Sequence, residues 1–197
     1  KGHIVENNGP DFSVDDVDDM LAGNDANVVV NILPDYKDAD VIVKVNGNVI
    51  NETTASGAFE QVISAGDLIA GENTVEVSVY GITKSITFNV YEIIIDVEDK
   101  EVMLGNDNSV TVTIPGAAGD IVIKVNDVEI ATPTLIDGSA TALIPAENIV
   151  NGENTVEVTY DGFTNSTTFN TITNIVTKDN FFDFFTEDGE LKEEIPF

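Results

Sequence analysis

The sequence predicts an all-β protein made of two consecutive β-sandwich modules, with a short helical segment after them. Three observations lead to this fold class. Residues 71–77, Gly-Glu-Asn-Thr-Val-Glu-Val, recur unchanged at residues 152–158. Short runs place apolar residues at every second position, which is typical of half-buried strands. Between residues 11 and 173, the apolar residues show no helical spacing.

The repeat extends beyond this heptapeptide and divides the chain. Its offset is 152 − 71 = 81 residues, and the same offset pairs Phe88 with Phe169 and Asn89 with Asn170. Upstream, Val-Lys-Val-Asn at 43–46 matches Ile-Lys-Val-Asn at 123–126, so one-residue insertions in loops shift the register. Self-similarity of this length indicates a duplicated structural unit. We therefore expect domain 1 at residues 11–92 and domain 2 at residues 93–173.

Each module is predicted to consist of short strands joined by tight turns. In domain 1, Val41, Val43 and Val45 take alternate positions, and Asn46-Gly47 supplies the left-handed conformations that a two-residue hairpin needs. In domain 2, Asp161-Gly162 predicts a second hairpin, and further alternating runs lie at 75–79, 86–90, 121–125 and 156–160. About seven strands per module, with turn signals between them, predict a Greek-key β-sandwich of the immunoglobulin type.

The joint and the two ends of the chain differ from the modules in composition. Residues 93–100, Ile-Ile-Ile-Asp-Val-Glu-Asp-Lys, contain no glycine or serine, which predicts a short and stiff joint. Residues 1–10, which hold the only histidine, His3, are expected to be disordered or tag-like. In residues 174–197, the spacing of four phenylalanines predicts an amphipathic helix that leads to a following domain: Phe181, Phe182, Phe184 and Phe185.

Composition excludes several classes of partner. The chain has 36 acidic and 8 basic residues, a formal net charge of −28, and every basic residue apart from His3 is a lysine. Nucleic acids and anionic membranes attract basic surfaces, so this chain is expected to bind neither. No apolar run is long enough for a membrane-spanning helix, and the charge favours a monomer. Cations, basic partners and neutral glycans remain open.

The strand and turn motifs together resemble a known family. The pattern is Gly-Asn-Asp, Val-x-Val-x-Ile-Pro, x-Asp-Ile-Val-Ile-Lys-Val-Asn and then Gly-Glu-Asn-Thr-Val-Glu-Val-x-Tyr-Asp-Gly. It is similar to the bacterial-type immunoglobulin-like repeats of adhesin-like surface proteins of methanogenic archaea. Residues 180–191 resemble the segment that leads into a right-handed β-helix in that family. The resemblance covers about residues 15–192 and implies display on the cell surface and a role in attachment, with no catalytic residues.

No constellation of catalytic residues is present, so we expect no enzyme and no cofactor. The chain has no cysteine and only one histidine, which removes Ser/His and Cys/His nucleophilic sites. No glycine-rich phosphate loop occurs. Carboxylate pairs are so frequent at this composition that no single pair indicates general acid–base chemistry.

Calcium is the one ion that the sequence makes worth testing. Asp96, Glu98 and Asp99 are expected at the joint, and a second acidic run, 15–19, precedes the first module. Ca²⁺ is bound by several oxygen ligands, often carboxylates. The alternative is a solvated acidic surface, because neither run has the ordered spacing of a known calcium loop.

Three further candidates concern modification and recognition. Asn51 and Asn165 begin Asn-x-Ser/Thr sequons and are expected on loops, as glycosylation sites or as chance matches. An isopeptide bond between Lys44 and Asn89, or between their repeats Lys124 and Asn170, is disfavoured because alternation directs these side chains to water. The four tyrosines form either part of a glycan platform or part of the core: Tyr36, Tyr80, Tyr91 and Tyr160.

The leading functional hypothesis is a stalk. Two end-to-end modules with a short joint would hold a binding domain away from the cell in an extracellular adhesin that contacts other cells, surfaces, glycans or proteins. The alternative is that the modules themselves bind a glycan or protein through end loops. The segments that differ most, 48–58 and 128–139, are the expected binding loops. An accessory domain of an enzyme is the third possibility.

Overall fold

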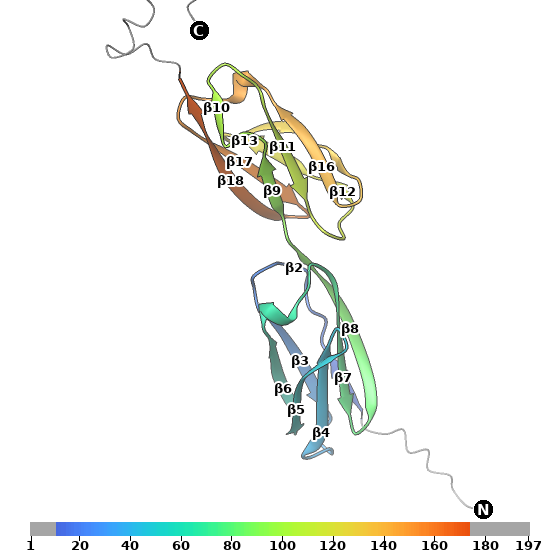
Figure 1. Ribbon diagram of the computed structural model, residues 1–197. Coiled ribbons are helices and arrows are strands. Elements are labelled where there is room, and N and C mark those ends of the chain that lie inside the picture. Colours follow the sequence, from blue (N-terminus) through green and yellow to red (C-terminus); the bar gives the residue numbers. More distant parts are fainter. Residues whose placement is uncertain (1–10, 174–197) are drawn as a thin grey trace, which may run out of the picture.

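The protein consists of two β-sandwiches placed end to end (Figure 1). The computed structural model describes residues 11–173. The predicted all-β fold class is confirmed, while the predicted helix and the tag-like N-terminus lie outside the described residues. The described part of the chain begins at the end of domain 1 that is remote from domain 2, and it finishes at the far end of domain 2 (Figure 1).

Domain 1 packs a three-stranded sheet against a five-stranded sheet. The sheets have the orders β1-β3-β6 and β2-β8-β7-β4-β5. A 3₁₀ turn, η1 (Ala65–Asp67), precedes β7. The strands are β1 (Phe12–Val14), β2 (Met20–Leu21), β3 (Ala26–Ile32), β4 (Ala39–Val45), β5 (Asn48–Ala55), β6 (Ala58–Ile63), β7 (Gly71–Val79) and β8 (Ile82–Tyr91).

Domain 2 repeats this arrangement, with one added pair of short strands. Its sheets have the orders β9-β11-β16 and β10-β18-β17-β13-β14, and β12 pairs with β15. The 3₁₀ turn η2 (Ala146–Asn148) occupies the place of η1. The strands are β9 (Ile94–Val97), β10 (Glu101–Met103), β11 (Asn108–Thr113), β12 (Gly119–Asp120), β13 (Val122–Val125), β14 (Val128–Ala131), β15 (Thr134–Leu135), β16 (Ser139–Ile144), β17 (Glu153–Tyr160) and β18 (Phe163–Ile172).

The cores follow the predicted alternation. Val41, Val43 and Val45 of β4 are at most 1% exposed, because alternate side chains of a strand point to the same face. Buried residues form two clusters, one from Phe12 to Val90 and one that begins at Tyr91. The core of domain 2 therefore includes the last residue of a domain 1 strand.

The predicted hairpins are confirmed by backbone conformation. Asn46 and Gly47 have φ of 49° and 84°, and Asp161 and Gly162 have φ of 48° and 81°. Two consecutive residues with positive φ are characteristic of the type I′ turn, whose twist matches that of the flanking strands. In domain 1, Tyr80 takes the place of Asp161 with φ of 47°, a conformation that tyrosine seldom adopts.

The asparagine of the repeated heptapeptide organises a buried hydrogen-bond network. Asn73 is fully buried, and its Oδ1 accepts from the Ile69 amide (2.9 Å) and from Asn46 Nδ2 (2.9 Å). Its Nδ2 donates to the carbonyls of Ile69 (2.8 Å) and Gly71 (3.1 Å). Every polar atom of this side chain is used, as burial requires.

Domain 2 contains the same network. Asn154 Oδ1 accepts from the Val150 amide and from Asn126 Nδ2, both at 2.8 Å. Its Nδ2 donates to the carbonyls of Val150 (2.9 Å) and Gly152 (3.1 Å). The identity of the two heptapeptides is thus explained by folding. In domain 1 the asparagine closes the turn before β7 and bonds it to the hairpin that follows β4; in domain 2 it does the same for β17 and β13.

Replacing Asn154 with alanine should destabilise domain 2 by about 3 kcal/mol, because several buried backbone and side-chain groups lose their partners. The matched change Asn73→Ala should act in the same way on domain 1. Asn170→Ala, at an exposed position of β18, is the control and should change stability by less than about 0.5 kcal/mol. Calorimetric unfolding measures all three, and equal losses for Asn154→Ala and Asn170→Ala would contradict the prediction.

A second prediction concerns two glycines of domain 2 with positive φ. Gly138 (φ +75°) and Gly162 (φ +81°) both have a backbone conformation that residues with a side chain rarely adopt. A Cβ at Gly138 would lie 2.7 Å from the Ile114 carbonyl oxygen, whereas one at Gly162 meets nothing within 4 Å. Gly162→Ala should therefore cost about 1 kcal/mol of stability from strain alone. Gly138→Ala should lower the melting midpoint markedly more, since backbone must also move.

Candidate functional site: the interdomain joint

Only two residues, Glu92 and Ile93, separate β8 of domain 1 from β9 of domain 2 (Figure 1). Ile93 is 4% exposed and belongs to the core cluster of domain 2. Its carbonyl accepts a hydrogen bond from Asn165 Nδ2 at 2.8 Å, so β18 holds the connecting chain directly. The predicted short joint is thus also a buried one.

An aromatic cluster crosses the domain boundary. Tyr91, the last residue of β8, packs edge-on against Tyr160, with ring centroids 5.0 Å apart and planes at 82°. The Phe163 ring lies 5.6 Å from Tyr91 on the same hairpin of domain 2. Leu21 of domain 1 packs against the same core cluster. Edge-on aromatic pairs add to the stabilisation that burial provides, so these contacts resist bending at the joint.

Small residues let the two domains approach closely. A Cβ on Gly116 would lie 3.4 Å from the Cα of Gly71, and one on Gly71 would lie 3.9 Å from the Pro115 carbonyl oxygen. Beside this contact, an open pocket of about 420 Å³ is lined by residues of both domains, including Leu21, Tyr91 and Asn165. The joint therefore combines a tight backbone contact with a shallow apolar hollow.

Tyr91 also has the one resolved pKa shift of the described chain. Its hydroxyl donates to Asp19 Oδ2 at 3.3 Å. Burial of the ring, followed by the nearby Asp19 carboxylate and Tyr160, raises the pKa of Tyr91 from 10.0 to about 12. The phenolate would be both desolvated and close to negative charge, so the neutral hydrogen-bonded form is favoured.

Asp19 anchors the joint from the domain 1 side. One of its oxygens accepts from the Asn89 backbone amide at 2.7 Å and from Asn89 Nδ2 at 3.3 Å. The other accepts from Tyr91. Sequence reasoning assigned Asp19 only to an acidic run, and the signal it lacked was the pairing of β2 with β8. Asn89 was expected to face water, and it lies half-buried on the face of β8 opposite to Phe88, where Asp19 accepts its hydrogen bonds.

The candidate calcium residues lie apart from this cluster. Strand β9 leaves the joint and runs into domain 2 (Figure 1). Asp96 of this strand is exposed and lies opposite Thr111. Glu98 Oε2 accepts from Ser109 Oγ at 2.5 Å, and the Asp99 amide donates to Asn108 Oδ1. Among residues 11–173, no three His, Cys, Asp or Glu side chains are grouped so that they could hold a metal ion. Calcium binding stays a prediction.

Both sequon asparagines lie in strands rather than in the expected loops. Asn51 is in β5, where its Nδ2 donates to Gln61 Oε1 at 2.7 Å. Asn165 is in β18 opposite Val158, and its Nδ2 is the group that holds Ile93. The solvent-facing residues of a strand are as polar as those of a loop, so composition alone did not distinguish a strand from a loop at these two positions. Glycosylation of either residue stays a prediction.

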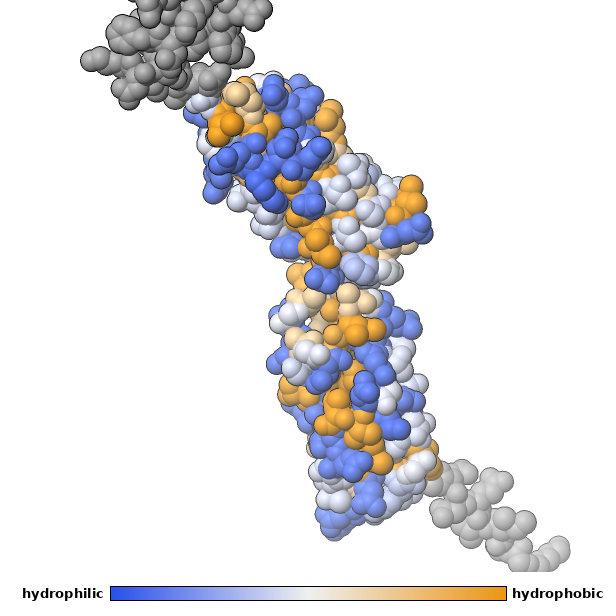
Figure 2. All heavy atoms as spheres, in the orientation of Figure 1, coloured by the Kyte–Doolittle hydropathy of each residue, from blue (hydrophilic) through white to orange (hydrophobic). Residues whose placement is uncertain are grey.

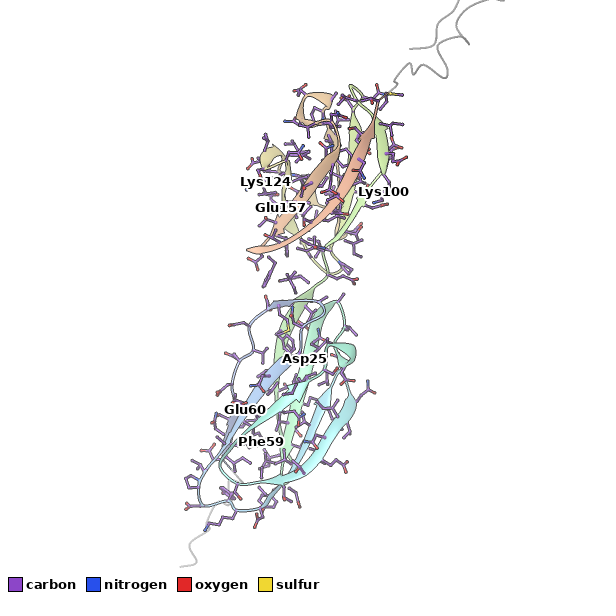
Figure 3. The ribbon with its side chains drawn as sticks, turned by 90° about the vertical axis from the view of Figure 1, so that its left-hand side faces the viewer. Asp25, Phe59, Glu60, Lys100, Lys124 and Glu157 are labelled. Atoms are coloured by element: carbon purple, nitrogen blue, oxygen red, sulfur yellow. The ribbon has the colours of Figure 1, made fainter. Side chains whose placement is uncertain are left out.

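Strand register separates the residues of the postulated isopeptide bond. Lys44 lies opposite Glu76, which in turn lies opposite Ser85 of β8. Asn89 is four residues further along β8, about 13 Å away, with β7 between the two strands. In domain 2, Lys124 likewise lies opposite Glu157 on the neighbouring strand (Figure 3). The lysines therefore meet glutamates rather than asparagines.

The expected binding loops and the tyrosine platform also differ from expectation. Of residues 48–58, Asn48–Ala55 form the edge strand β5, and residues 128–139 contain β14 and β15. The tyrosines separate into two pairs: Tyr91 with Tyr160 at the joint, and Tyr36 with Tyr80, 6.4 Å apart between ring centroids, away from it. Much of both segments is therefore strand and not loop, because the pairing of a backbone segment depends on the neighbouring strand as well as on its own composition.

Comparisons with known proteins find likenesses among solved structures. No protein-family model and no curated sequence matches the chain. Among solved structures, Rst D1-D2 is 9% identical, with 84% of this chain and 99% of that chain covered and a TM-score of 0.42. The insect immune protein hemolin is 16% identical, with coverages of 88% and 48% and a TM-score of 0.42. The titin Ig tandem domains A164-A165 are 8% identical, with coverages of 83% and 96% and a TM-score of 0.35.

These likenesses concern the fold alone, since function does not follow from fold. The strand orders given above make each domain a two-sheet, immunoglobulin-like sandwich. In the described part of the chain, no helix is long and apolar enough to cross a membrane. The chain thus contains tandem immunoglobulin-like domains, and their joint is held by buried aromatic contacts and hydrogen bonds.

The raised pKa of Tyr91 predicts a pH dependence. Because the pKa of Tyr91 in the folded protein, about 12, exceeds the ordinary tyrosine pKa of 10.0, the stabilising effect of its neutral form is complete below pH 10 and is lost as pH rises towards 12. An ultraviolet titration of tyrosinate should show a step near pH 12 that Tyr91→Phe removes. Tyr80→Phe should keep that step, and a step that survives in Tyr91→Phe would contradict the assignment.

The calcium prediction is tested by thermal unfolding with and without EDTA. Saturation at a hundred times Kd would add about 2.7 kcal/mol and raise the melting midpoint by several degrees. Asp96→Asn combined with Glu98→Gln and Asp99→Asn should abolish that rise. A melting midpoint indifferent to both Ca²⁺ and EDTA would remove the prediction.

Proposed function

We propose that this chain is a stalk segment of a cell-surface adhesin and that it holds a binding domain away from the cell. The observation that carries the proposal is the burial of Tyr91, a domain 1 residue, in the core of domain 2. A buried joint between sandwiches placed end to end gives a long and stiff unit. The family resemblance of the strand and turn motifs supports an extracellular location and an archaeal adhesin-like protein.

Stiffness is useful in a stalk for a physical reason. A flexible linker has a root-mean-square extension that grows only with the square root of its length, so most of its contour does not add reach. A folded rod has already lost that conformational entropy during folding. The described chain enters and leaves at opposite ends, so each module adds its full length (Figure 1).

The charge distribution suits display at high density. With a net charge of −28, neighbouring copies repel one another at moderate salt, which favours extended and separate stalks. Each large sheet carries a lysine opposite a glutamate. In domain 1 these are Lys44 and Glu76, and in domain 2 they are Lys124 and Glu157 (Figure 3). These single lysines temper the repulsion locally without creating a basic patch.

The proposal is tested by measuring the stiffness of the joint. The chain has no cysteine, so Thr87→Cys and Thr168→Cys, both at exposed positions of β8 and β18, place one spin label in each domain. The interdomain distance distribution should be narrow. Tyr91→Ala combined with Asn165→Ala should broaden it, whereas Tyr80→Ala should leave it unchanged. If the interdomain distance distribution of the wild-type chain is as broad as that of a variant with a Gly-Ser insertion after Glu92, the stalk proposal is wrong.

One observation favours recognition as a second function. Tyr80 is 46% exposed in the β7–β8 turn of domain 1, beside Tyr36. The Tyr36 amide donates to the carbonyl of Leu33, whose side chain is also 46% exposed. Exposed aromatic rings combine an apolar face with a polar group, which suits the apolar faces of sugars. We expect Tyr80→Ala to abolish binding on a glycan array if the modules are receptors. Binding that survives this change, or a blank array with wild-type chain, would contradict this alternative.

A further inference from the structure

The dipeptide Asn-Gly occurs three times in the chain, and its asparagine is open to a particular chemical change. It stands at 8–9, 46–47 and 151–152. The backbone amide nitrogen that follows an asparagine can attack the carbonyl carbon of the asparagine side chain. Glycine favours this attack, because it has no Cβ to hinder the approach. The dipeptide at 8–9 lies outside the described residues, and the fold holds the other two differently.

The change is a deamidation in two steps that uses only water. First, the glycine amide nitrogen gives its proton to solvent base and bonds to the asparagine Cγ, while the side-chain nitrogen takes a proton from water and leaves as ammonia. Water then opens the succinimide ring at one of its two carbonyl carbons. One opening gives aspartate. The other gives isoaspartate, in which the backbone runs through the former side chain and is one methylene longer.

The fold holds the side chain of Asn46 in place. Its Nδ2 donates to Asn73 Oδ1 at 2.9 Å, and its Oδ1 accepts from the Thr74 amide at 3.0 Å. The side chain must leave both hydrogen bonds before its Cγ can meet the Gly47 amide nitrogen. Since each bond stabilises the folded arrangement, the reactive geometry at Asn46 is rarely populated.

The side chain of Asn151 is exposed and weakly held. Within residues 11–173 its Nδ2 donates no hydrogen bond, and its Oδ1 accepts only one long bond, from Thr171 Oγ1 at 3.4 Å. The reaction also needs water, and hydrophilic residues occupy much of the domain 2 surface that Figure 2 shows. The side-chain amide of Asn151 can therefore rotate towards the backbone while the fold stays intact.

One contact restrains the attacking nitrogen at this site. The Gly152 amide donates to Thr171 Oγ1 at 2.7 Å. Thr171 is the last residue but one of β18, where a strand end opens more readily than its middle. This single bond between neutral groups must open before the amide loses its proton. Opening it costs less than opening both bonds of Asn46.

Asn151 lies inside the turn that the buried Asn154 closes. Asn154 bonds the backbone of Val150 and of Gly152, the residues on each side of Asn151. An isoaspartate at this position would lengthen the backbone between them by one methylene. The turn could then no longer make all of these bonds, and a buried polar group that loses its partner is costly.

Domain 1 forms the same turn without a reactive side chain. Its equivalent residues are Ala70 and Gly71. Gly71 has φ of 97°, against 96° for Gly152, so the backbone conformation of the glycine is the same in both domains. The asparagine at 151 is therefore not needed to form this turn, and alanine is a substitute that the fold already accepts.

We propose that Asn151 is a site of spontaneous deamidation in the folded protein and that Thr171 controls its rate. Asn46 stays an asparagine under the same conditions. The isoaspartate product loosens the turn before β17, so domain 2 loses stability as the protein ages while domain 1 does not. The reaction depends on the turn of domain 2 alone, so it is independent of the stalk proposal.

The test follows the full chain as it ages at mildly alkaline pH, below its melting midpoint. Peptide mapping by mass spectrometry detects the replacement of the amide nitrogen by oxygen, and the elution time separates aspartate from isoaspartate. We expect Asn151 to convert at least about tenfold faster than Asn46. In the chain unfolded by denaturant, both should convert at similar rates, because both precede glycine.

Three variants separate the effect of the fold from that of the dipeptide. Thr171→Val removes the acceptor of the Gly152 amide and should raise the rate at Asn151 severalfold, with no effect at Asn46. Thr168→Val, at an exposed position of the same strand, is the matched control and should change neither rate. Asn151→Ala should abolish the loss of several degrees in the melting midpoint of domain 2 that we expect on ageing.

Each contrary result has a definite meaning. Equal rates at Asn46 and Asn151 in the folded chain would overturn the proposal, because the dipeptide alone would then set the rate. An Asn151 that stays intact while the unfolded chain converts would overturn it as well. Equal rates in Thr171→Val and Thr168→Val would remove the role of Thr171. An aged chain that has converted at Asn151 but melts like fresh chain would contradict the loosened turn.

Discussion

The burial of Tyr91 across the domain boundary is the constraint on which the arrangement of the two domains depends. Its ring lies in the core of domain 2, while its hydroxyl is bonded to Asp19 of domain 1. Bending the joint would expose the ring to water and separate the phenol from its acceptor. A single side chain thus couples the hydrophobic core of one sandwich to the polar network of the other.

Within each sandwich, stability rests on a second repeated feature, the buried asparagine of the heptapeptide. Asn73 and Asn154 use all their donors and acceptors to close one turn and to tie it to a hairpin of the same sheet. Satisfied polar networks in a core fix geometry more strictly than apolar packing does, because a lost partner is costly. This explains why duplication kept these seven residues while the surrounding strands diverged.

The divergence between the domains is concentrated where their surroundings differ. The tip of domain 2, around Gly116, touches domain 1 and carries small residues, whereas the equivalent tip of domain 1 carries Tyr36 beside Tyr80. Both domains keep a contact that holds the entering chain, through Asn165 in one and Lys84 in the other. The shared parts therefore serve folding and connection, and the different parts follow from what each end meets.

The sequence by itself determined the duplication, the sandwich class and the hairpins at Asn46-Gly47 and Asp161-Gly162, because alternation and positive-φ turns are local properties. It did not determine that Asn51 and Asn165 lie in strands, that Asp19 bonds Asn89 and Tyr91, or that Asp96, Glu98 and Asp99 extend away from the joint. These facts depend on contacts with other strands, between residues 10 positions apart for Asn51 and Gln61 and 72 positions apart for the 2.8 Å bond from Asn165 to Ile93. Only strand pairing brings such residues together, and a short sequence window carries no record of it.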